Sequence, residues 1–135
     1  AKMVNAMANS VVPKFSIVIG NSYGAGNYAM CGKAYDPTLI VGWPTAEIAV
    51  MGAQGAVNIL YRSEISEAKD PEKARAELIT EYNETLANPY LAAERGFIDA
   101  VIEPAQTRLS ISKALRALRN KRVELPPRKH GNIPL

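Results

Sequence analysis

The sequence predicts an α/β layered fold with parallel strands. Short apolar runs rich in β-branched residues alternate with segments of helical spacing, and turns containing glycine or proline separate them. A chain of 135 residues with 47% hydrophobic content is long enough to bury one core. We therefore expect a single domain over residues 1–119, followed by an extended basic arm over residues 120–135.

The N-terminal ten residues are expected to be helical. Met3, Ala6 and Met7 recur at the spacing of one helix face. Neither a signal peptide nor an initiator methionine precedes them. We expect the sequence to begin inside a helix of a longer chain, and the missing part to cover one face, so that an isolated stable monomer would be surprising.

Three short apolar segments in the first half are expected to be extended. They are residues 14–19 (KFSIVI), 39–41 and 46–51 (AEIAVM), each bounded by glycine or proline. A glycine-rich turn follows the first of them and leads into a helix beginning near Asn27. Residues 52–62 have helical spacing, with Val57 and Leu60 or Tyr61 on one face.

Helix signals are clearest in the second half. After a polar stretch at 63–70, interpreted as a linker, Asp70 is a helix N-cap and Pro71 the first helical residue. A short helix over 90–95 ends at Gly96, and a strand is expected over 97–102. The helix that starts at Pro71 has an apolar face of Ala74, Leu78, Tyr82 and Leu86. A last helix starts at Pro104, and its apolar face contains Ile111, Leu115 and Leu118.

The net charge of +3 is concentrated in the last third of the chain. A nucleic-acid interface would be expected to interleave aromatic and basic residues, and the basic stretch from Arg108 onward contains no Tyr, Phe or Trp. We therefore expect no nucleic-acid partner. The basic residues are expected either to form a solvated helix face with a basic tail or to contact the phosphates of a nucleotide ligand. The basic residues of this stretch are Arg108, Lys113, Arg116, Arg119, Lys121, Arg122, Arg128 and Lys129.

A single cysteine, Cys31, excludes an intrachain disulfide, which fits a reducing compartment. With one cysteine and one histidine, a zinc site of these ligands is excluded, and no metal site is predicted. Cys31 is interpreted as a small buried hydrophobe and not as a nucleophile. No apolar run is long enough to span a bilayer, so a soluble protein is expected.

Residues 20–29 (GNSYGAGNYA) match more than one motif. Gly20 to Gly24 fits the G-x-S-x-G nucleophile elbow between a strand and a helix, with Ser22 as nucleophile. Asp99 and His130 follow in the required order. Since His130 lies in a proline-rich tail, where precise placement beside the serine is not expected, a serine hydrolase is the least favoured interpretation.

The stretch Gly24 to Ala29 fits the G-x-G-x-x-A dinucleotide fingerprint, with Glu47 at the distance of a ribose-binding acid. Its register argues against it, because three residues separate the predicted strand from Gly24. A P-loop is excluded, since no Gly-Lys-Ser/Thr follows.

The simplest interpretation of the loop is a set of backbone donors. A glycine-rich turn that enters a helix presents unpaired N–H groups at the positive end of the helix dipole, which suits a developing oxyanion. The small residues Gly24, Ala25 and Gly26 would let a ligand oxygen approach. A turn that is glycine-rich only for tight packing remains the alternative.

Two longer blocks carry a resemblance. SYGAGNYAMCGKAYDP and WPTAEIAVMGAQGAVNILYRSEI, together with the ending RKHGNIPL, resemble the carboxyltransferase (beta) subunits of propionyl-CoA, methylcrotonyl-CoA and related biotin-dependent acyl-CoA carboxylases. The resemblance covers essentially the whole chain. It implies a crotonase-like (ClpP/crotonase) fold and an N-terminally truncated C-terminal carboxyltransferase domain.

The family's active site is divided, and the resemblance implies the same here. The N-terminal domain of one subunit holds the acyl-CoA, the C-terminal domain of another receives carboxybiotin, and full-length subunits form homo-hexamers. Biotin as cofactor would arrive on a biotin carboxyl carrier, charged by a biotin carboxylase subunit. The implied location is the cytoplasm, or the mitochondrial matrix in a eukaryote.

By the same resemblance, the family's second oxyanion hole falls on the backbone N–H groups of Ala25 and Gly26, with Gly24 also at the biotin-binding turn. These donors would face the ureido oxygen of biotin during carboxyl transfer to the α-carbon of a short- or branched-chain acyl-CoA. Tyr28 matches a position that lines the acyl pocket, against the alternative of an aromatic packed under the loop.

The resemblance leaves the substrate open, since the AGNYAM stretch is nearer to methylcrotonyl-type enzymes and WPTAEIAVMGAQG to propionyl-type enzymes. A sodium-pump-type decarboxylase that runs the same chemistry in the releasing direction is the close alternative. An inactive assembly fragment is the alternative of another class.

Overall fold

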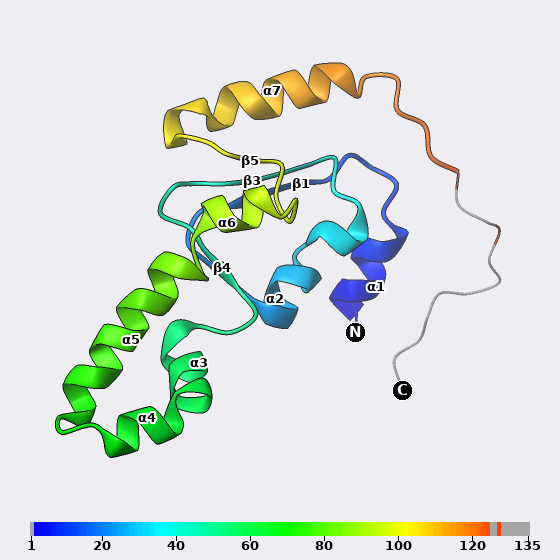
Figure 1. Ribbon diagram of the computed structural model, residues 1–135. Coiled ribbons are helices and arrows are strands. Elements are labelled where there is room, and N and C mark those ends of the chain that lie inside the picture. The colour runs from blue at the N-terminus through cyan, green and yellow to red at the C-terminus, as the bar shows by residue number, and fades with distance from the viewer. Residues whose placement is uncertain (1, 125–126, 128–135) are drawn as a thin grey trace.

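The computed structural model describes residues 2–124 and residue 127. Two parallel sheets lie at the centre (Figure 1). One contains β1 (Phe15–Val18), β3 (Leu39–Gly42) and β5 (Ala100–Val101) in the order β1-β3-β5; the other pairs β2 (Asn21–Tyr23) with β4 (Glu47–Ala49). The predicted α/β architecture with parallel pairing is confirmed.

The central strand β3 is the most buried part of the larger sheet, with Ile40 and Val41 only 1% and 2% exposed. Its N-terminal residue Leu39 lies opposite Phe15, so the apolar runs of β1 and β3 pair along their whole length. The strand expected over 97–102 is reduced to β5. The N–H groups of Phe97 and Ile98 both donate to the carbonyl of Ala92, which closes the preceding helix and keeps them out of the ladder.

The expected turn after β1 differs from the structure. Residues 21–23 form β2, because β4 offers them a parallel partner in the register Asn21↔Glu47 and Tyr23↔Ala49. Helix α2 (Gly24–Ala29) then begins at once, three residues earlier than the predicted start near Asn27.

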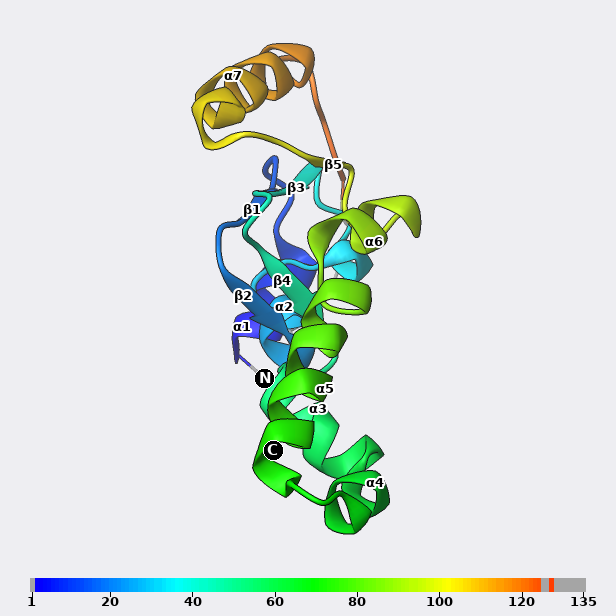
Figure 2. The same ribbon diagram turned by 60° about the vertical axis from the view of Figure 1, so that its left-hand side comes forward.

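Three helices gather at one end of the molecule: α3 (Ala53–Leu60), α4 (Arg62–Glu67) and α5 (Pro71–Thr85) (Figures 1 and 2). The predicted linker over 63–70 is wrong over its first five residues, because Ile65 packs into the apolar cluster that includes Val57 and Tyr82. The predicted start of α5 is confirmed, since the Asp70 carboxylate accepts the Lys73 N–H at 3.2 Å.

The remaining elements are α1 (Lys2–Asn9), the 3₁₀ turns η1 (Lys33–Tyr35) and η2 (Pro104–Gln106), α6 (Pro89–Glu94) and α7 (Thr107–Ala117). Both views place α7 beyond β5, at the opposite end from α4. It has no buried residue, and Leu115 on its predicted apolar face is 51% exposed. No helix among the described residues is long and apolar enough to cross a bilayer. Most of the predicted arm lies outside the described residues, so the boundary at residue 119 stays a prediction.

Candidate functional site

The candidate site lies where the small sheet ends. Strands β2 and β4 are parallel, so both leave the sheet at the same edge. Tyr23, the last residue of β2, is the N-cap of α2, and Gly52, three residues after β4, is the N-cap of α3. The edge therefore carries two neighbouring helix N-termini.

Gly24 makes the direct passage from strand to helix possible. Its φ is +50°, a conformation that disfavours residues with a Cβ atom. A Cβ built there would lie 2.8 Å from the carbonyl oxygen of Val50, closer than real Cβ contacts. Two independent constraints, conformation and space, thus require glycine at this position.

Ala25 and Gly26 lie in the first turn of α2 and not in a loop. The first four N–H groups of an α-helix have no acceptor within the helix, and no side chain caps this one. Both residues are exposed, and no atom lies within 4 Å of the place where a Gly26 Cβ would be. An anionic oxygen can therefore approach these donors at the positive end of the helix dipole.

Tyr28 follows on the same helix and is 53% exposed. Within the described chain it is not packed as a core aromatic under the turn. Its contact with a ligand stays a prediction.

Behind the donors, the Tyr23 hydroxyl donates a hydrogen bond to Glu47 Oε2. Burial, together with this hydrogen bond and the negative charge of Glu47, raises the pKa of Tyr23 to about 12. The sequence prediction missed this pair. A single carboxylate within an otherwise apolar strand was the available signal, because a half-buried charge needs a hydrogen-bond partner.

The same pair bears on the dinucleotide fingerprint. The register objection raised from the sequence is wrong, because β2 runs directly into Gly24. Glu47 nevertheless opens β4 opposite Asn21, at the far end from the helix N-terminus, and its carboxylate accepts from Tyr23. A ribose-binding acid lies at the carboxyl end of its strand, so the geometry does not fit.

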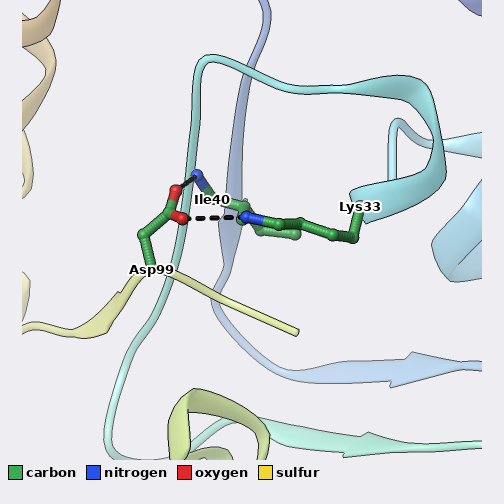
Figure 3. Close-up of polar contacts among 3 residues, drawn as sticks. All are labelled: Lys33, Ile40 and Asp99. Carbon is green, nitrogen blue, oxygen red and sulfur yellow. Dashed lines mark hydrogen bonds and ion pairs between the residues drawn. The ribbon is translucent and has the colours of Figure 1, made fainter. Parts of the chain in front are cut away.

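The serine-hydrolase interpretation is also disfavoured, because Asp99, its proposed acid, is bound to other groups. The Asp99 carboxylate accepts the Ile40 N–H at 2.8 Å and pairs with Lys33 Nζ at 3.0 Å (Figure 3). Partial burial alone would raise the pKa of Asp99, but the Ile40 hydrogen bond and the Lys33 ammonium outweigh it and hold the pKa below its usual value. Asp99 therefore fastens η1 and β5 to β3, and His130 lies outside the described residues.

Cys31 is 5% exposed, in agreement with its interpretation as a small buried hydrophobe. No group of three or more His, Cys, Asp or Glu side chains suited to a metal ion occurs among residues 2–124 and 127. The described residues at the strand edge thus offer backbone donors, small residues and exposed apolar side chains.

Comparisons with known proteins all match the chain to carboxyltransferases and related enzymes. The carboxyl transferase domain model matches residues 1–133. The chain is 50% identical over its full length to the propionyl-CoA carboxylase carboxyltransferase subunit of Haloferax mediterranei, and 47% identical to the methylmalonyl-CoA decarboxylase subunit alpha of Propionigenium modestum. In each case it covers 26% of the relative, so it spans about a quarter of their length.

The fold comparison agrees with the sequence comparison. The structure of the transcarboxylase 12S hexamer, with methylmalonyl-CoA and methylmalonic acid bound, matches 99% of this chain and 26% of its own. The TM-score is 0.90 at 46% identity, which confirms the crotonase-like fold that the resemblance implied. The matched parallel strands, the helices around them and the aligned sequence all lead to the same conclusion: the chain belongs to the carboxyl transferase domain family.

Proposed function

We propose that the protein containing this chain transfers a carboxyl group between biotin and the α-carbon of an acyl-CoA, and that this chain supplies the biotin-side oxyanion hole. The observation that carries the proposal is the pair of exposed, uncapped N–H groups of Ala25 and Gly26 at the start of α2. Donors fixed before the reaction stabilise negative charge as it develops, and losing one typically costs about 3 kcal/mol.

The residues at this edge fit the biotin ring system. The turn brings no charged side chain, the space beside Gly26 is open, and Tyr28 offers an exposed aromatic surface. Bound carboxybiotin would supply the carbon dioxide and a ring nitrogen able to take the α-proton. The chain's own part is to hold the ureido oxygen on two backbone donors, with Gly24 allowing β2 to pass directly into the first helical turn.

The acyl-CoA side of the site belongs to the part of the protein that this chain does not include. The proposal therefore includes an N-terminal domain that holds the acyl-CoA, a biotin carboxyl carrier, and a biotin carboxylase subunit. It also includes a hexamer, supported by the hexameric assembly of the 12S transcarboxylase. The cytoplasm is the proposed location, consistent with the buried, unpaired Cys31.

For the substrate, we favour a short chain, and propionyl-CoA or methylmalonyl-CoA in particular. Relatives named for these two compounds are 50% and 47% identical to this chain. This narrows the choice that the two sequence blocks left between propionyl- and methylcrotonyl-type enzymes.

Decarboxylation, the reverse direction of the same chemistry, is the second candidate function. The Propionigenium relative is a methylmalonyl-CoA decarboxylase subunit, so release of carbon dioxide is the alternative outcome. The companion subunits discriminate between the two: co-purification with a biotin carboxylase supports carboxylation, and co-purification with a membrane decarboxylase subunit supports decarboxylation.

The test uses the full-length protein with free biotin and methylmalonyl-CoA, and follows propionyl-CoA formation. Wild type should turn over, and residues 1–135 alone should not. Replacing Ala25 or Gly26 by proline removes one N–H, which the first helical turn does not use internally. We expect kcat to fall by about 10²- to 10³-fold, with KM for the acyl-CoA little changed.

Thermal unfolding of each proline variant is the necessary control, because proline also restricts the preceding residue. Wild-type turnover by a folded proline variant would overturn the oxyanion assignment. Absence of turnover by the wild-type protein would overturn the proposed function itself. Turnover by residues 1–135 alone would refute the divided site.

A further inference from the structure

The hydroxyl of Tyr23 and the carboxylate of Glu47 meet directly behind the proposed donors. Tyr23 ends β2 and immediately precedes the turn, whereas Glu47 begins the neighbouring strand β4. Because Tyr23 is in register with Ala49, its side chain runs diagonally back along the sheet to reach Glu47. The bond therefore joins the end of one strand to the start of the other.

The ring of Tyr23 also contacts the second helix N-terminus. A Cβ added to Gly52, the N-cap of α3, would lie 3.1 Å from Tyr23 Cε2, so the ring lies against the Gly52 backbone. The Tyr82 hydroxyl donates to the carbonyl of Met51, the neighbouring residue of the same turn, at 3.4 Å. The turn between β4 and α3 is thus contacted both by a ring from β2 and by a hydroxyl from α5.

The turn between β4 and α3 also limits the position of α2. Gly24 is in close backbone contact with Val50, since a Cβ at Gly24 would lie 2.8 Å from the Val50 oxygen. A shift of residues 50–52 would therefore displace Gly24, and with it the N–H groups of the next two residues. A displacement of the Tyr23 backbone would move the same N–H groups directly, since Tyr23 is the N-cap of α2.

We propose that Tyr23 and Glu47 are positioning residues for the Ala25 and Gly26 donors, an inference that rests on the proposed function. Their hydrogen bond fixes the first turn of α2 against the turn that leads into α3, without touching the ligand. The geometry assigns the phenol as the donor and the carboxylate as the acceptor. The raised pKa of Tyr23 is consistent, because the phenol stays protonated throughout the range in which an enzyme works.

The expected effect is on turnover and not on acyl-CoA binding. Catalytic groups must be held within a few tenths of an ångström, and a misplacement of about 1 Å can cost about 10²-fold in rate. Tyr23→Phe removes the hydroxyl and keeps the ring against Gly52. We expect kcat in the full-length protein to fall by about 10- to 100-fold, while KM for methylmalonyl-CoA stays within about twofold.

Three further variants make the test specific. Glu47→Gln keeps an oxygen that accepts from the phenol and should retain most of the activity, whereas Glu47→Leu should fall as far as Tyr23→Phe. The double variant Tyr23→Phe/Glu47→Leu should lose no more than either single variant, because both remove the same bond. Tyr90→Phe is the matched control, since Tyr90 is 60% exposed on α6 and should behave as wild type.

Each possible outcome supports or overturns the positioning role of Tyr23 and Glu47. Wild-type kcat in Tyr23→Phe, or in Glu47→Leu if Tyr23→Phe does not fold, overturns the positioning role and leaves the proposed function standing. Equal loss in Glu47→Gln and Glu47→Leu also overturns it, because a hydrogen-bond role requires rescue by glutamine. An inactive wild-type protein refutes the function on which the inference rests, and is recognised before any variant is measured.

Discussion

Adding one methyl group at Gly24 should disable the donor turn more than its size suggests. At φ +50°, alanine costs about 1–2 kcal/mol relative to glycine. The new Cβ would also lie 2.8 Å from the Val50 oxygen, and ordinary contact begins near 3.4 Å, so the backbone must move by several tenths of an ångström. For Gly24→Ala we expect a loss of roughly 2 kcal/mol in stability and about 10-fold or more in kcat.

The assay is propionyl-CoA formation by the full-length protein from methylmalonyl-CoA and free biotin, with chemical unfolding measured in parallel. Gly20→Ala is the matched control, because no atom lies within 4 Å of its built Cβ and its φ is not in the left-handed region. It should match wild type in both measurements. A Gly24→Ala protein with wild-type stability and turnover would refute the reasoning from conformation and contact.

Two further predictions concern Ser22 and Asp99, the nucleophile and the acid of the hydrolase interpretation. Ser22→Ala should keep kcat within about threefold of wild type, because the proposed chemistry uses no nucleophilic serine; complete loss of turnover in a folded variant would revive the hydrolase interpretation. Asp99→Asn should lower the free energy of unfolding by less than about 1 kcal/mol at pH 7, since Lys33 and Asp99 are exposed. Because the folded-state pKa of Asp99 is lowered, its contribution is present above the unfolded value of about 4 and is lost as pH falls through the folded pKa, so unfolding curves of the two proteins should converge in acid.

Local chemistry predicted the elements whose signals are local. The start of α5 needs only Asp70 and Pro71, and both act as expected. The helix over 62–67 was missed because its one buried residue, Ile65, is apolar in a polar stretch, and only the packing against Val57 and Tyr82 explains it. Strand β2 was missed for a similar reason, since three polar or aromatic residues become a strand only where β4 lies alongside.

The candidate site likewise has one part that local sequence predicted and one part that depends on tertiary structure. The small residues at 24–26 predicted backbone donors without any structure; α2 begins at Gly24 with no side-chain cap, and the role of its N–H groups stays a prediction. The Tyr23–Glu47 bond joins residues 24 positions apart, and its existence depends on the register of two strands, which the sequence does not specify. The exposed edge carries Val50 at 87% exposure, an apolar residue that fits the prediction of a covering part elsewhere in the protein.

The chemistry that this edge can perform is limited by the groups it lacks. Residues 20–31 contain no Asp, Glu, Lys, Arg or His. Two groups in or near this stretch are engaged elsewhere, since Tyr23 is bound to Glu47 and Lys33 is paired with Asp99. This stretch can hold and stabilise an anionic oxygen on its backbone donors, and it brings no carboxylate, imidazole or amine to act as a general base. Under the proposed function, a ring nitrogen of biotin takes the α-proton, and the described chain contributes the two backbone donors that hold the ureido oxygen.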